Sequence, residues 1–203
     1  MLELEKLPLI VENFTSKEDC EEIVKWANFA YGVKHEVMFI KSGRNRAPYI
    51  NVPDVVYKNA DKVMDEFDLR SYESTLDVFV NRHEEGGQVF PHVHTPKWCG
   101  WNGYVDLRIN LLVSKPHKGG VPIVENKEYE INEGDLIIFD AAEDHSTDIV
   151  EGDKDRYLIS YGFYCLFDED GKLTVSDGNF PTSILSTYGY GQGQRSFPEI
   201  PYA

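Results

Sequence analysis

The stretch Phe90-Pro91-His92-Val93-His94-Thr95 places two histidines one residue apart, directly after an apolar run. In an extended strand, side chains i and i+2 lie on the same face, so both imidazoles can approach one metal ion. A third histidine, His145, closely follows the apolar run Leu136-Ile137-Ile138-Phe139. Neutral imidazole suits iron, zinc, copper and nickel. The pattern predicts a metal site made by His92, His94 and His145, with His94 alternatively facing solvent or substrate.

The composition narrows the classes of partner. The 203 residues include 35 acidic and 20 basic side chains, which gives a net charge of −15. Such a surface repels phosphate backbones and argues against nucleic acid, whereas it suits solubility or a cationic substrate. Cys20, Cys99 and Cys165 are widely spaced and no secretory signal precedes them, so we expect reduced thiols and a cytoplasmic protein. No apolar run approaches the roughly 20 residues that span a bilayer, so no membrane partner is expected.

The hydrophobic period changes along the chain. Residues 7–11 read as a strand, a helix begins at Thr15 or Ser16, residues 34–40 read as a strand, and a second helix runs from Pro53 to about Phe67. From residue 74 the pattern is extended, with strands expected at 75–81, 88–94, 103–113, 121–124, 127–131, 135–139, 146–150 and 157–166. The order predicts an α+β domain whose β-sandwich or barrel core is buttressed by N-terminal helices.

We expect one domain over residues 1–177, with its β core at about 74–167. Residues 178–203 are rich in Gly, Tyr and Pro and form a C-terminal arm. That arm is open to several interpretations: a lid, a strapped-down segment, a homodimer contact or a poorly ordered tail.

Arg156 is a candidate for holding an anion. It opens the apolar strand Tyr157-Leu158-Ile159-Ser160-Tyr161, soon after His145. A guanidinium aimed into a barrel can hold a carboxylate through two hydrogen bonds. On pattern alone, a surface arginine neutralised by Asp153 or Asp155 fits as well; the nearby histidines favour the carboxylate anchor.

Arg108 and Asn110 share one face of a strand whose other face is apolar. Inside a barrel these polar groups need hydrogen-bond partners, which a bound carboxylate would provide. A solvated outer face fits the pattern equally well. The remaining histidines, His35, His83 and His117, stand alone in polar or turn contexts and are predicted to be surface residues.

The set of residues resembles the iron(II)/2-oxoglutarate-dependent oxygenase superfamily. Its members fold as a double-stranded β-helix (jelly roll) and carry His-x-Asp/Glu, a distal His, and then Arg or Lys. Pro91-His92-Val93-His94, the strand at 107–113, the run 134–139, His145 and Arg156 follow that order. Residues 7–14 and the helix after them are similar to the prolyl 4-hydroxylase-like branch, and residues 107–145 resemble the aspartyl/asparaginyl β-hydroxylase branch.

The resemblance implies Fe(II) bound by His92 and His145, with His94 in place of the usual carboxylate ligand. It implies that Arg156 grips the distal carboxylate of 2-oxoglutarate, helped by Arg108 or Asn110, with no catalytic residue beyond the metal ligands. The implied reaction is hydroxylation of a small molecule, amino acid or peptidyl residue, with release of succinate and CO2. The acidic surface slightly favours a basic substrate. Trp98, Trp101 and Tyr104 are candidates for a pocket wall or for packing.

The same residues also resemble a cupin. Gly86 through His92-x-His94 is similar to the first half of a cupin motif, and Glu133-Gly134-Asp135 through His145 to the second. A three-histidine cupin would be a dioxygenase or isomerase that does not use 2-oxoglutarate. The glutamate expected after the first histidines is absent, and Arg156 is more typical of the oxygenases. A non-catalytic binding barrel is the third alternative.

Overall fold

The computed structural model describes residues 2–33, 38–42, 45–46, 52–69, 77–94 and 104–174. His35, Cys99, Trp98, Trp101 and the arm at 178–203 lie outside these ranges, as does most of the strand expected at 34–40. The elements, in chain order, are η1 (Leu4–Lys6), β1 (Leu9–Val11), α1 (Lys17–Val33), β2 (Met38–Ser42), β3 (Asn45–Arg46), α2 (Asp54–Glu66), β4 (Asp77–His83), β5 (Tyr104–Ser114), β6 (Pro122–Val124), β7 (Lys127–Glu128), β8 (Leu136–Asp140), β9 (His145–Thr147), β10 (Arg156–Phe167) and β11 (Leu173–Thr174).

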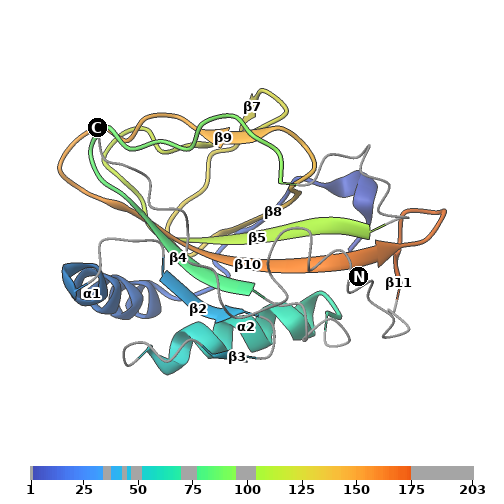
Figure 1. Ribbon diagram of the computed structural model, residues 1–203, viewed down its shortest axis with the longest axis horizontal. Coiled ribbons are helices and arrows are strands. Elements are labelled where there is room, and N and C mark those ends of the chain that lie inside the picture. The colour runs from blue at the N-terminus through green and yellow to red at the C-terminus, as the bar shows by residue number, and fades with distance from the viewer. Residues whose placement is uncertain are drawn as a thin grey trace.

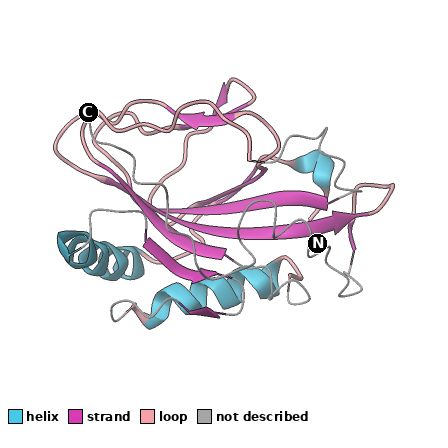
Figure 2. Ribbon diagram, viewed as in Figure 1, coloured by secondary structure: helices cyan, strands magenta, loops and turns pink. Residues whose placement is uncertain are grey.

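The strands form two antiparallel sheets. The larger has the order β1-β8-β5-β10-β4-β2-β3, with β11 paired to the end of β10, and the smaller has the order β7-β6-β9. Helices α1 and α2 lie against one face of the larger sheet, and the smaller sheet lies over the other face (Figures 1 and 2). The predicted α+β class, with few helices and antiparallel strands, is confirmed.

Both helices form where the periodicity predicted them. The Ser16 hydroxyl caps α1 by accepting a hydrogen bond from the Asp19 backbone N–H at 3.1 Å. The buried apolar residues recur at helical spacing on each helix, namely Cys20, Ile23, Ala27 and Ala30 on α1 and Val56, Ala60, Val63 and Met64 on α2. They pack in one cluster with alternate residues of β5 and β10. Each large apolar side chain buried there contributes about 1.5–3 kcal/mol.

The other face of the larger sheet has a different character. Residues of β5 alternate between the faces, so Leu107, Ile109 and Leu111 join the helix-packed core. Arg108 and Asn110 lie between them and line a cavity under the smaller sheet. A small second apolar cluster, which includes Leu112, lies on that side.

Three of the predicted strands are shorter than expected. Residues 88–94 are extended, but they pair through a single bridge between His92 and His145. Pro91 interrupts this segment and has no N–H to donate to a ladder. The strands expected at 127–131 and 146–150 shrink to β7 and β9, since each finds a partner over only a few residues. None of the described helices is long and apolar enough to cross a membrane.

Candidate functional site

His92 and His145 are held by matching sets of backbone contacts. Their backbones exchange two hydrogen bonds, at 3.1 Å from His92 N and 3.0 Å from His145 N. The Nδ1 of His92 lies 2.8 Å from the Phe90 carbonyl oxygen, and the Nδ1 of His145 lies 2.9 Å from that of Glu143. Because a carbonyl can only accept, each Nδ1 carries the proton and each Nε2 keeps its lone pair. This is the usual way in which proteins prepare histidine to bind a metal.

His94 completes the cluster. Its backbone N–H donates to the Ala141 carbonyl at 2.8 Å, and its Nε2 lies 3.2 Å from the Nε2 of His92. Its Nδ1 faces the Asp106 carboxylate at 3.5 Å. One ligand atom from each of the three imidazoles lies within 4.8 Å of the others.

One pair in the cluster has the spacing that a metal ion requires. Two nitrogens bound at about 2.1 Å to one ion lie about 3.0–3.4 Å apart for octahedral or tetrahedral angles. The distance of 3.2 Å between His92 and His94 falls in this interval. A cation shared between these two nitrogens would take the place of the direct contact between the rings.

His94 and His145 are in the neutral form that binds metals. Burial lowers the pKa of His145 to about 4, and the neighbouring His94 and His92 act in the same direction against the hydrogen bond to Glu143. Burial also lowers the pKa of His94, although the contact with Asp106 opposes it. Neither ring needs to lose a proton before binding a cation at pH 7.

Asp106 was not among the site residues predicted from the sequence. Its side chain is buried, and its Oδ1 lies 3.0 Å from the Nε of Arg108. Burial alone would raise its pKa, but Arg108 and His94 outweigh burial and hold the pKa below its ordinary value. The sequence did carry an indication of its place: Asp106, Arg108 and Asn110 stand at every second position of one strand and so share one face of it.

Arg156 is fully enclosed, with 2% of its surface exposed. Its Nη1 lies 3.3 Å from the Nδ1 of His83, and its Nε has no hydrogen-bond partner among the described residues. Asp155 pairs instead with Arg82 at 2.6 Å, and Asp153 pairs with His117, so the alternative of a surface arginine is wrong. Burial lowers the pKa of Arg156 to about 10, with Asp148 opposing. The guanidinium is still charged at neutral pH and suits an anion.

His83 also differs from the prediction. It was expected on the surface, but it is partly buried beside Arg156. Burial and then the Arg156 charge lower its pKa to about 4, so its neutral Nδ1 accepts from the guanidinium. His117 is exposed, as predicted.

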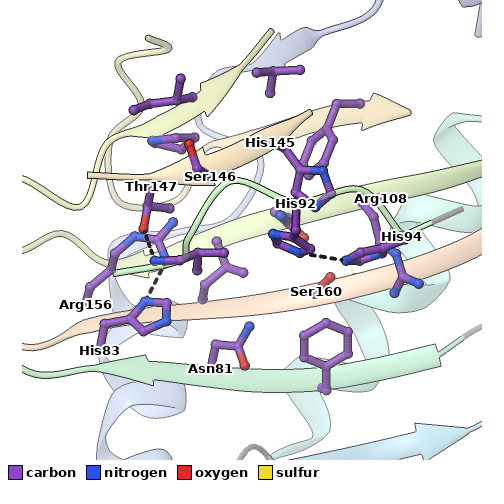
Figure 3. A pocket seen from close by; sticks show the side chains of 18 residues that line it. Asn81, His83, His92, His94, Arg108, His145, Ser146, Thr147, Arg156 and Ser160 are labelled. Carbon is purple, nitrogen blue, oxygen red and sulfur yellow. Dashed lines mark hydrogen bonds between the residues drawn. The ribbon is translucent and has the colours of Figure 1, made fainter. Parts of the chain in front are cut away.

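All six predicted site residues border one cavity of about 120 Å³. In Figure 3 the three histidines gather at one end, and Arg156 lies with His83 at the other. The Oδ1 of Asn110 is buried there without a partner among the described residues. The buried Arg156 cation, facing a small cavity, is what a carboxylate ligand would satisfy, whereas the Asn110 oxygen is an acceptor and needs a donor such as water.

No family model and no curated protein sequence matches the chain. Several solved structures share its fold. The viral collagen prolyl hydroxylase of Paramecium bursaria Chlorella virus-1, in complex with 2-oxoglutarate, has a TM-score of 0.58 at 15% identity and covers 78% of this chain and 96% of that chain. A prolyl-4-hydroxylase from Pseudomonas putida has a TM-score of 0.56 at 11% identity, covering 77% and 91%.

HygX from Streptomyces hygroscopicus, with nickel and 2-oxoglutarate bound, has a TM-score of 0.55 at 11% identity and covers 77% of this chain and 81% of that chain. The resemblance inferred from the sequence is therefore confirmed at the level of the fold. This chain is similar in architecture to prolyl hydroxylases of the 2-oxoglutarate oxygenase class.

Proposed function

We propose that this protein is an Fe(II)- and 2-oxoglutarate-dependent oxygenase. It hydroxylates a small molecule, an amino acid or a peptidyl residue and releases succinate and CO2. One observation carries the proposal: three clustered imidazoles line the same cavity as a buried arginine whose Nε has no hydrogen-bond partner among the described residues.

The domain organisation follows from this proposal. The two sheets are the two sides of a double-stranded β-helix, whose core spans about residues 74–167 within one domain at 1–177. Antiparallel pairing throughout both sheets and the open cavity between them support that description.

In this proposal His92, His94 and His145 hold the iron. Bound ferrous iron supplies the site at which dioxygen is reduced while 2-oxoglutarate is oxidatively decarboxylated. Arg156 holds the distal carboxylate of 2-oxoglutarate, and His83 orients the guanidinium from its other side. Arg108 and Asn110 line the cosubstrate cavity between the two ends.

The similar structures support both cofactors. One is described as a complex with 2-oxoglutarate and another with nickel and 2-oxoglutarate. The collagen prolyl hydroxylase among them also makes a peptidyl substrate reasonable for this chain. The net charge of −15 favours a basic segment in such a peptide.

The test is an anaerobic Fe(II) titration with and without 2-oxoglutarate, followed through the visible charge-transfer band of the chelated cosubstrate. We expect a saturable band, and we expect Arg156→Met to weaken 2-oxoglutarate binding by about 10- to 150-fold, which corresponds to ~1.5–3 kcal/mol for a charged hydrogen bond. The matched control is Arg82→Met, because Arg82 pairs with Asp155 and Glu84 and does not line the cavity.

The other outcomes identify the alternatives. Iron binding without the band would indicate a three-histidine enzyme of the cupin type that does not use 2-oxoglutarate. Absence of iron binding would leave a non-catalytic binding barrel.

A further inference from the structure

A buried carboxylate lies behind one of the three histidines. Asp106 has 3% of its surface exposed, and its Oδ2 lies 3.5 Å from the Nδ1 of His94. His94 occupies the position at which the resembling oxygenases carry a carboxylate ligand. Asp106 places a negative charge at this corner of the site, one imidazole further from the metal position.

Arg108 forms an ion pair with this carboxylate. Its Nε lies 3.0 Å from Oδ1 and its Nη2 lies 3.4 Å from Oδ2 of Asp106. The guanidinium lies over Gly162 of the neighbouring strand, where an added Cβ would come within 2.5 Å of Nη1. A buried guanidinium beside it favours the ionised carboxylate, and the Oδ2 that accepts from Nη2 is also the oxygen that faces Nδ1 of His94.

The three histidines differ in the group that faces the Nδ1 atom of the ring. His92 and His145 donate from Nδ1 to neutral backbone carbonyls, whereas Nδ1 of His94 faces a full negative charge. An imidazole that donates to a carboxylate becomes a more basic ligand at its other nitrogen, and its tautomer and orientation are fixed.

We propose that Asp106 is the positioning residue for His94: it fixes the Nδ1–H tautomer and supplies, through the imidazole, the negative charge that a carboxylate ligand would supply directly. The inference rests on the proposed function, since it requires a metal ion at the histidine cluster. It also explains why a carboxylate and a guanidinium are buried side by side on β5.

The experiment is a double-mutant cycle on cobalt(II) affinity, measured by calorimetry and by visible absorption. Asp106→Asn should weaken cobalt binding by about 10- to 100-fold in the otherwise unchanged chain. In the His94→Gln background the same substitution should change the affinity by less than about threefold, because the two residues act as one unit. The matched control is Asp135→Asn, a buried carboxylate that bonds the backbones of Asn13 and Asn132 outside the cavity and should leave cobalt affinity unchanged.

Asp106→Asn leaves Arg108 buried without its carboxylate, so Asp106→Asn/Arg108→Gln provides a second variant in which the fold does not carry an unpaired charge. A readout without metal is the nitrogen-15 NMR spectrum of the His94 ring, which should show Nδ1–H in the wild type and a larger Nε2–H population in both variants.

This inference would be overturned if Asp106→Asn left the cobalt affinity unchanged, or if it caused equal losses of affinity in the wild-type and His94→Gln chains. Neither result would contradict the metal site itself. No cobalt binding by the wild-type chain would instead overturn the proposed function and this inference together. The two failures are therefore distinguishable.

Discussion

The two faces of the larger sheet are both enclosed, yet they bury opposite kinds of side chain. On β5, Leu107, Ile109 and Leu111 are completely buried against the helices. At alternate positions of the same strand, Asp106 and Arg108 are almost as deeply buried on the face under the smaller sheet. Strand β5 therefore has an apolar face and a charged face, because its successive side chains point to opposite sides of the sheet.

The contrast between the two faces indicates which of them stabilises the fold. Burial of apolar side chains stabilises the protein, whereas burial of charges usually costs more free energy than their pairing returns. We therefore infer that the role of the charged face is to bind a ligand and not to stabilise the fold. Substitutions on the helix-packed face should change stability with little effect on binding, and those on the cavity face should do the opposite.

The largest expected effect lies on the cavity face. His145→Ala should abolish metal-dependent turnover, because it removes the most deeply buried of the three ligand rings. The unfolding free energy of the metal-free chain should fall by only about 1–3 kcal/mol, the cost of one buried polar contact. Succinate formation and urea unfolding measure the two effects; His117→Ala, at an exposed histidine, is the control. Full turnover in His145→Ala would contradict the site.

Ile109→Ala tests the opposite face. The side chain is completely buried in the helix-packed cluster, so its truncation should lower the unfolding free energy by about 2–5 kcal/mol. Cobalt affinity of the folded variant should match that of the wild type within about threefold. Urea unfolding and calorimetry check this pair of values. A strong loss of metal affinity would show that the two faces are not independent.

Gly162→Ala tests the contact between β10 and the buried ion pair. The added Cβ would lie 2.5 Å from Nη1 and 3.0 Å from Cζ of Arg108, so the guanidinium that pairs with Asp106 must shift. We expect a destabilisation of about 1–3 kcal/mol from overpacking, measured by urea unfolding. In an Arg108→Gln background most of this cost should disappear, and an unchanged cost there would place the strain elsewhere.

The smallest effect concerns pH. Burial lowers the pKa of His83 to about 4, below its ordinary value of 6.5, so the unfolded chain binds more protons between these values. Stability of the metal-free protein should therefore fall as pH drops from about 6.5 to 4, by on the order of 1 kcal/mol for this partly solvated ring. Thermal unfolding across that range, compared between wild type and His83→Gln, checks the slope. Identical slopes would argue against a buried neutral His83.

Sequence patterns predicted the long strands well, because β5, β8 and β10 carry extended apolar runs. They also indicated the six residues that border the cavity, since histidines at strand ends and polar residues alternating on apolar strands have local signatures. His83 was missed because the expected strand ended at residue 81. Pairing of Arg156 with His83 extends β4 by two residues, and such long-range pairing has no local signal.

Asp106 was missed for a different reason. Its alternation with Arg108 was visible, but its contact with His94 depends on how the segment at 88–94 crosses the sheet. That segment was expected to be a regular strand, and its single bridge to His145 could not be read from the sequence. The roles assigned to the six cavity residues stay predictions until a ligand is observed.

The most direct test is a crystal structure obtained anaerobically with manganese(II) and 2-oxoglutarate, with the metal located by its anomalous signal. The account predicts one ion about 2.0–2.3 Å from the Nε2 atoms of His92, His94 and His145. It also predicts that the distal carboxylate of 2-oxoglutarate contacts the guanidinium of Arg156. An ion outside the three imidazoles, or a cosubstrate carboxylate bound away from Arg156, would contradict it.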